Sequence, residues 1–333
     1  MAARMIGLSQ MWRIVLPEAR DAVSGYFPAD SMAVQVMSNR AVGLTYGQRA
    51  LVIGAVHPQL AVGTFENTAH RETPYNRLML TARLFETVFL GTKEEADRAV
   101  EFTRRKHATV AGTLPEDAGK YPAGTAYSAS DPHLMYMTMA FAFDSAHHMQ
   151  NLLVRRLTAD ESERFWQDFV RWAELFGMPR SAAPSSYREF RADFDEYLAS
   201  DLPHLTGEAH TVGSYLAGVK RADYDTPPPI RPLFRTIDLV VKGSLPRRVR
   251  EMYGFSWTPA HRVAFRAAVQ GTRALYFEPP RFVPRPLDPV LRGSNLGPFK
   301  IVAATERRQL RRGRYSMPET LDGRDEAAAS TSG

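Results

Sequence analysis

The sequence predicts an all-α protein, with a single large multi-helix domain built around a buried central helix. Three observations support this prediction: strand-like alternation is nearly absent, apolar residues recur at helical spacing, and helix-start signals are frequent. With 333 residues and 44% hydrophobic content, the chain can bury a large core. We expect residues 1–39 to dock onto the core as an extension, residues 40–290 to form the main domain, and residues 291–333 to form a largely disordered basic tail.

Composition excludes several kinds of chemistry. The chain contains no cysteine, so disulfides, thiolate zinc sites, iron–sulfur clusters, covalently attached haem and cysteine nucleophiles are all ruled out. Any metal must therefore be held by His, Asp, Glu or Tyr.

Charge indicates little about partners. The formal net charge of +6 is modest and is typical of a soluble protein, so we expect no nucleic-acid partner. Contact with an anionic membrane surface stays open for one basic stretch, which holds Arg307, Arg308, Arg311, Arg312 and Arg314.

No targeting or membrane-spanning segment is expected. The first 20 residues lack an uninterrupted apolar run of signal-peptide length, which favours the cytoplasm. The longest apolar run is interrupted by Asp144, His147 and His148, which makes it too short to span a bilayer.

Residues 44–65 are mostly small and apolar and predict a buried helix, bent near His57 and Pro58. Its small residues permit close approach of another helix. His57 is a candidate metal ligand, although a polar residue satisfied at a proline kink is the commoner interpretation of such a histidine.

Residues 74–90 predict an amphipathic helix that begins at Pro74. Arg77, Thr81 and Val88 are separated by four and seven residues, so they lie on one side of that helix. Arg77 and Thr81 should therefore point the same way, into the protein.

A second amphipathic helix follows. Thr92 and Glu95 form a capping box, and a stripe of four residues then recurs at helical spacing: Val100, Thr103, His107 and Val110. We expect His107 to be buried in this stripe, where an imidazole facing Arg77 and Thr81 is suited to hold a metal or a charged cofactor. A hydrogen-bonded core histidine beside a paired or solvated arginine is the alternative.

Residues 113–130 predict a long loop, and Asp131 with Pro132 then starts a helix of about 25 residues. The first half of this helix is apolar on all sides, which is typical of the centre of a helical core. Asp144 and His148 lie four residues apart and are suited to share a metal, or else to cap the exposed end of the helix.

The remaining helices are announced by their N-terminal signals. Thr158 with Glu161, and Ser186 with Glu189, are spaced as capping boxes. Apolar helical stretches follow at residues 233–241 and 259–277.

Nucleotide-binding, zinc-protease and α/β-hydrolase motifs are all missing from the sequence. For a helical, cysteine-free chain with buried histidines, non-covalent haem and a carboxylate–histidine metal site are the leading possibilities.

Several segments resemble, in order, the family of helical haem oxygenases that includes latex-clearing protein and MpaB. They are GQRALVIGAVHPQLAVGTF, PYNRLMLT, GTKEEADRAV, HATVAG, AYSASDP, the dipeptide Asp144-Ser145, LPRRVREMYGFSW and RFVPRP. The match covers about residues 40–285, and the order and spacing of the segments carry it.

The resemblance implies haem b with His107 as the proximal iron ligand, and Arg77 and Thr81 close to the haem. A distal glutamate of the rubber enzymes falls near Glu66. Two positions depart from the family. Leu80 stands where latex-clearing proteins carry a lysine, and Met139 stands where many members carry a histidine, which makes rubber a doubtful substrate.

From this resemblance we expect an oxygenase that uses haem b and dioxygen or peroxide on a small, largely apolar molecule, isoprenoid-like or a secondary metabolite. Three alternatives stay open: a peroxide-using haem enzyme or desaturase, a haem sensor or carrier without turnover, and a cofactor-free interaction protein.

Overall fold

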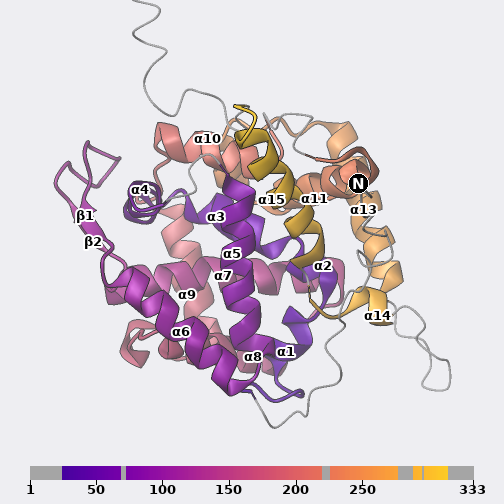
Figure 1. Cartoon of the computed structure of the whole chain (residues 1–333), viewed down its shortest axis with the longest axis horizontal. Helices are drawn as coiled ribbons and strands as arrows, with labels where there is room; N and C mark the ends of the chain where they lie inside the picture. The colour runs from indigo at the N-terminus through magenta and orange to yellow at the C-terminus, as the bar shows by residue number, and fades with distance from the viewer. Residues whose placement is uncertain (1–24, 69–72, 220–225, 277–287, 295, 314–333) are drawn as a thin grey trace, which may run out of the picture.

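The computed structural model describes residues 25–68, 73–219, 226–276, 288–294 and 296–313, and helices dominate them (Figure 1). Their bounds are α1 Met32–Met37, α2 Arg40–Gly43, α3 Tyr46–Gly54, α4 Pro58–Glu66, α5 Pro74–Leu90, α6 Lys93–His107, α7 Pro132–Leu153, α8 Ala159–Leu175, α9 Tyr187–Ala199, α10 Gly207–Leu216, α11 Arg231–Ser244, α12 Arg247–Met252, α13 Pro259–Leu275, α14 Asp288–Leu291 and α15 Leu296–Leu310. Short 3₁₀ turns lie at Arg180–Ala182 and Pro228–Ile230, and the strands are β1 Ala111–Thr113 and β2 Ala126–Ser128. The prediction of an all-α fold is confirmed.

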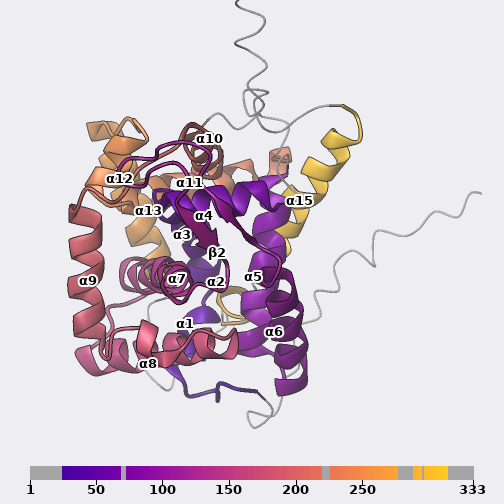
Figure 2. The same ribbon diagram turned by 90° about the vertical axis from the view of Figure 1, so that its left-hand side faces the viewer.

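Helix α7 is the centre of the molecule. Figure 2 views it nearly end-on, with α5 and α6 to the right, α8 below and α9 to the left. Asp131 caps it by accepting a hydrogen bond from the Leu134 amide at 2.9 Å, and Pro132 occupies its first turn. Its Phe143 is fully buried among rings of α8 and α9, including Trp166 and Phe190. The predicted buried central helix is thus confirmed.

The apolar segment before Pro74 forms two helices. Helix α3 ends at Gly54, and α4 begins at Pro58 after His57, its N-cap residue, whose backbone is extended. The expected bend at His57 and Pro58 is therefore a full break. Gly54 of α3 approaches α7 so closely that a Cβ there would lie 3.3 Å from Phe141, which confirms the role of small residues in helix packing.

Helices α5 and α6 form an antiparallel hairpin, joined at Gly91 and Thr92. The predicted capping box is present, because Thr92 accepts from the Glu95 amide while the Glu95 carboxylate accepts from the Thr92 amide. The segment expected as a long loop contains a short antiparallel pair instead, with Ala111 opposite Ser128 and Thr113 opposite Ala126. Three-residue strands are too short for alternation to reveal them.

Asp144 and His148 do not form a metal site. Asp144 is buried and accepts from Arg49 of α3 at 2.6 Å and from Arg191 of α9 at 2.5 Å. These two guanidinium groups hold the pKa of Asp144 below its ordinary value, although burial alone would raise it. Among the described residues, no cluster of three His, Asp or Glu side chains is suited to hold a metal ion. The cap interpretation is also wrong, because this part of α7 lies inside the core.

The C-terminal part is more ordered than its composition predicts. Residues 296–310 of the expected disordered tail form α15, which lies against α5 with Phe299, Val302 and Glu306 buried. This helix has basic residues on its outer side and apolar residues on its inner side, so its high charge did not predict whether it is ordered. Residues 314–333 lie outside the described residues, as do residues 1–24. In the part of the chain that is described, no helix has the length and apolar character needed to cross a bilayer.

Candidate active site

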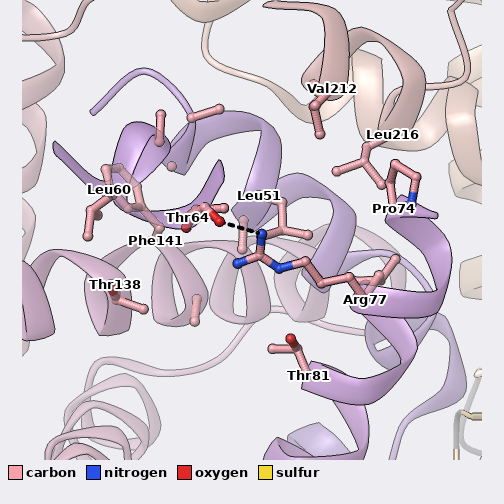
Figure 3. A pocket seen from close by; sticks show the side chains of 18 of the residues that line it. Leu51, Leu60, Thr64, Pro74, Arg77, Thr81, Thr138, Phe141, Val212 and Leu216 are labelled. Carbon is pink, nitrogen blue, oxygen red and sulfur yellow. Dashed lines mark hydrogen bonds between the residues drawn. The ribbon is translucent and has the colours of Figure 1, made fainter. Parts of the chain in front are cut away.

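A pocket lies between α3, α4, α5, α7 and α10, and its walls are mainly apolar (Figure 3). Leu51, Leu60, Phe141 and Leu216 are among its apolar lining residues. The polar side chains of the lining are few: Thr64, Thr68, Arg77, Thr81, Thr138 and Glu208. An apolar pocket with a small number of polar groups is the usual form of a small-molecule site.

Arg77 is the cation of this pocket. Figure 3 shows its guanidinium extended from α5 toward α4, where one Nη donates to the Thr64 carbonyl oxygen at 3.2 Å. Among the described residues, no carboxylate lies within ion-pair distance of Arg77. Burial lowers the pKa of Arg77 to about 10, which reflects the cost of holding a cation away from water. A half-buried cation that has no counter-charge among the described residues favours binding of an anionic group.

Thr81 follows Arg77 by one helical turn on the same side of α5, and both line the pocket. The sequence-based expectation that the two side chains point the same way, into the protein, is met. Thr81 adds a hydroxyl that can donate to or accept from a ligand beside the guanidinium.

The start of α5 is held by a residue far away in sequence. Thr73, its N-cap residue, makes no side-chain cap, and instead the Glu306 carboxylate of α15 accepts from the amides of Tyr75 at 3.0 Å and Asn76 at 2.8 Å. The Tyr215 hydroxyl of α10 donates to the same carboxylate at 3.0 Å. Since Arg77 is the next residue of α5, Glu306 fixes the backbone from which the pocket cation extends.

His107 is not buried, contrary to the sequence-based expectation. Helix α6 buries Ala96, Ala99 and Val100, whereas Thr103 is half-buried and His107 is exposed at the end of the helix. The predicted stripe fails in the last turn because α6 packs on α5 chiefly through its first half. The ring does not line the pocket, although enough protein surrounds it to lower the pKa of His107 by desolvation.

His107 and Arg77 lie at similar distances along their helices from the turn that joins them. Counted from the turn, His107 is the fifteenth residue of α6 and Arg77 the fourteenth residue back from the end of α5. At 1.5 Å per residue, both are about 20 Å from the turn. Figure 1 shows that α6 runs obliquely away from α5, and His107 at its end does not line the pocket.

The other residues singled out from the sequence lie outside the pocket lining. Glu66 is exposed at the end of α4, although Phe65 beside it lines the pocket. Leu80 is 39% exposed on α5, and Met139 is buried in α7. Conversely, sequence reasoning did not single out Thr64, Thr138, Glu208 or Glu306. Of these four residues, only Thr138 could have been identified from its local sequence, because it is a polar residue in the apolar half of the central helix.

Comparison with known proteins gives one match. Residues 34–274 match the sequence model of a family described as "ER-bound oxygenase mpaB/B'/Rubber oxygenase, catalytic domain". No curated protein and no solved structure matches the chain.

Proposed function

The chain belongs to the family of the mpaB and rubber oxygenase catalytic domain, and from this we propose that it is a haem b-dependent oxygenase. Its substrate, in this proposal, is a small and largely apolar molecule, isoprenoid-like or a secondary metabolite. One observation carries the proposal beyond the family: Arg77, which is half-buried and has no ion-pair partner among the described residues, extends into an apolar pocket.

The pocket residues fit haem b in two respects. The porphyrin faces are apolar, as are the walls formed by residues such as Leu51, Leu60 and Phe141. Haem b also carries two propionates, and Arg77 is a cation that forms no ion pair within the part of the chain that the structure describes. Arg77 would thus hold a propionate, and Thr81 would donate a hydrogen bond beside it. The third requirement, an axial imidazole, is met by no described residue of the pocket lining, and we assign it to His107 on the family resemblance alone.

His107 suits that role chemically. Only a neutral imidazole ligates iron, and the lowered pKa of His107 keeps its ring unprotonated at neutral pH. Held by His107, haem b would supply the iron chemistry that activates dioxygen or peroxide. The absence of cysteine from the sequence excludes a thiolate ligand.

The remaining residues shape the surroundings of the reaction. The apolar walls exclude water and hold an apolar substrate by burial of its surface. Leu80 carries no group that competes for iron. Glu66 remains a candidate for moving a proton, because α4 ends there and the adjacent Phe65 lines the pocket. We further propose that residues 40–290 are the catalytic domain and that the protein acts in the cytoplasm.

Absorption spectra of protein reconstituted with haem test the proposal. The wild-type protein should show a Soret band, and His107→Ala should lose most of it while the helical circular dichroism is unchanged. Arg77→Gln should lower haem retention because a propionate loses its cation. Two exposed residues serve as matched controls, since His133→Ala and Arg83→Gln should keep the wild-type spectrum.

The outcomes separate the alternatives. A protein without a Soret band is a cofactor-free interaction protein, and the proposal fails. If His107→Ala keeps its Soret band while His57→Ala loses it, the ligand is assigned wrongly. Haem binding without oxygen consumption, across a panel of apolar alkenes, indicates a sensor or carrier.

A further inference from the structure

Helix α13 is apolar on two opposite sides, and only one of them is packed against the protein. The inner side holds Phe265, Ala268 and Val269, which are buried or half-buried. Contact with α11 is close, because a Cβ at Gly243 would lie 2.3 Å from Phe265. This side alone accounts for the attachment of α13 to the molecule.

The outer side of α13 is an exposed apolar stripe. Val263 is 67% exposed and Leu275 is 53% exposed, which are large values for such side chains. The stripe recurs at spacings of three, four and seven residues and comprises Ala260, Val263, Ala264, Ala267, Gly271, Ala274 and Leu275, all of them exposed. A Cβ at Gly271 would meet nothing within 4 Å, so no described residue covers this side.

A row of arginines runs beside this stripe. Arg262 and Arg266 are exposed and Arg273 is half-buried, and their spacing of four and seven residues puts them on one flank of α13. The helix contains no Asp or Glu, so nothing on it neutralises these cations. An amphipathic helix with exposed apolar residues and flanking cations is the usual form of an interfacial helix.

The part of the chain around α13 is also strongly positive. Residues 226–313 contain 17 Lys and Arg against 5 Asp and Glu, a formal charge of +12. The rest of the protein contains 25 Lys and Arg against 31 Asp and Glu, a formal charge of −6. Figure 1 shows α11, α13, α14 and α15 together in the right-hand half of the molecule. On these neighbours, Arg235, Lys300 and Arg308 are exposed, as are the apolar Leu233 and Ile301.

We propose that the outer side of α13 docks onto an anionic lipid surface, with Val263 and Leu275 in contact with the acyl boundary and the arginine row on the headgroups. Charge complementarity favours this occupant over a second copy of the chain, since two such faces would bring unneutralised cations together. The exposed apolar stripe favours lipid over nucleic acid, whose phosphates offer no apolar surface. This inference does not depend on the proposed haem chemistry.

Vesicle co-sedimentation of the full chain tests the proposal. The protein should bind vesicles that contain phosphatidylglycerol and not vesicles of phosphatidylcholine alone, with binding weakened by salt. Arg262→Gln with Arg266→Gln should weaken binding about thirty-fold, because each cation near an anionic surface contributes roughly one kcal/mol. The control pair Arg164→Gln with Arg188→Gln removes the same charge from exposed sites on α8 and α9 and should bind as the wild type does.

A fluorescent substitution reports where the stripe lies. In Val263→Trp, tryptophan emission should shift to shorter wavelength on anionic vesicles and stay unshifted with phosphatidylcholine. Emission already at short wavelength before vesicles are added would mean that the protein's own chain or a second copy covers the stripe, and the proposal would be overturned. Equal loss of binding in both double variants, or binding to duplex DNA without binding to vesicles, would also overturn it.

Discussion

His57 and His107 carry the same ring in opposite surroundings. His57 is 0% exposed, and neither ring nitrogen has a hydrogen-bond partner within the described part of the chain, where Tyr121, His133 and Tyr197 surround the ring. The proline break expected from the sequence is present, but the hydrogen bonds expected to satisfy the ring are not. Burial lowers the pKa of His57 to about 4, so the folded protein holds this ring neutral.

This burial predicts a fold that weakens in mild acid. The pKa of His57 falls from an ordinary value of 6.5 to about 4, so its contribution to stability is complete above pH 6.5 and is lost as the pH falls toward 4. The shift corresponds to about 3 kcal/mol at most. Urea unfolding of the wild type at pH 7 and pH 5 should show the loss, and His57→Phe should reduce it.

The loss will not vanish in His57→Phe, because burial also lowers the pKa of His147 to about 4 and that of His148 to about 3. His133→Ala removes a neighbouring ring whose charge helps burial to lower the pKa of His57, and it should weaken the dependence on pH less than His57→Phe does. An identical loss of stability in the wild type and in His57→Phe would show that His57 accepts its proton without cost.

At the residue scale, helical spacing predicted the direction of side chains better than it predicted their burial. Arg77 and Thr81 share a side of α5 because two residues four apart do so in any helix. Burial depends on what the facing element covers, and α5 covers only the first half of α6, so His107 is exposed. Thr64 and Glu208 line the same pocket from two other helices, and no local spacing connects them to Arg77.

Among the elements, α15 and α5 form the pair on which the pocket most depends. The Glu306 carboxylate accepts two amides at the start of α5, in the place where a capping side chain of its own would act. A carboxylate there also complements the positive end of the helix dipole. Helix α15 thereby supports the turn from which Arg77 extends.

Replacing Glu306 should therefore disturb α5 more than α15. Glu306→Ala leaves two buried amides without their acceptor, which costs about 1–3 kcal/mol each at most. We expect faster hydrogen exchange at the amides of Tyr75 and Asn76 and weaker haem retention than in the wild type. Arg308→Ala changes an exposed residue of the same helix and should leave both measurements unchanged. Unaltered exchange at Tyr75 in Glu306→Ala would refute the capping role.

Capping signals in the sequence predicted the helices whose N-termini are fixed by residues close together in the chain. The capping boxes at Thr92 and Thr158 and the Asp131 cap were predicted because each joins residues three apart. Helix α15 was missed because its order comes from packing against α5, more than 200 residues earlier. The distances that matter for such an element are spatial, and a single sequence does not contain them.

For the whole molecule, the all-α fold was predictable because helical periodicity repeats along most of the chain and the central helix is apolar on all sides. The excess of positive charge in residues 226–313 can also be counted from the sequence, but the surface that these cations flank cannot be read from it. Only the structure shows that Arg262, Arg266 and Arg273 lie beside an exposed apolar stripe on α13. The proposed boundaries of the catalytic domain, residues 40–290, remain a prediction.

The last prediction concerns the reaction of the whole protein. An apolar pocket favours an apolar substrate, and the family of the chain is one of oxygenases. We therefore expect oxidative cleavage or oxygenation at a carbon–carbon double bond, with the oxygen atoms of the product taken from dioxygen. Reduced, haem-loaded protein incubated with isotopically labelled dioxygen and a panel of prenylated or terpenoid alkenes should yield labelled products by mass spectrometry. Thr138→Ile fills the pocket from α7 and should slow the larger alkenes most. Substrate consumed without incorporation of label would instead indicate a desaturase or a peroxide-using enzyme, because neither transfers oxygen from dioxygen to the product.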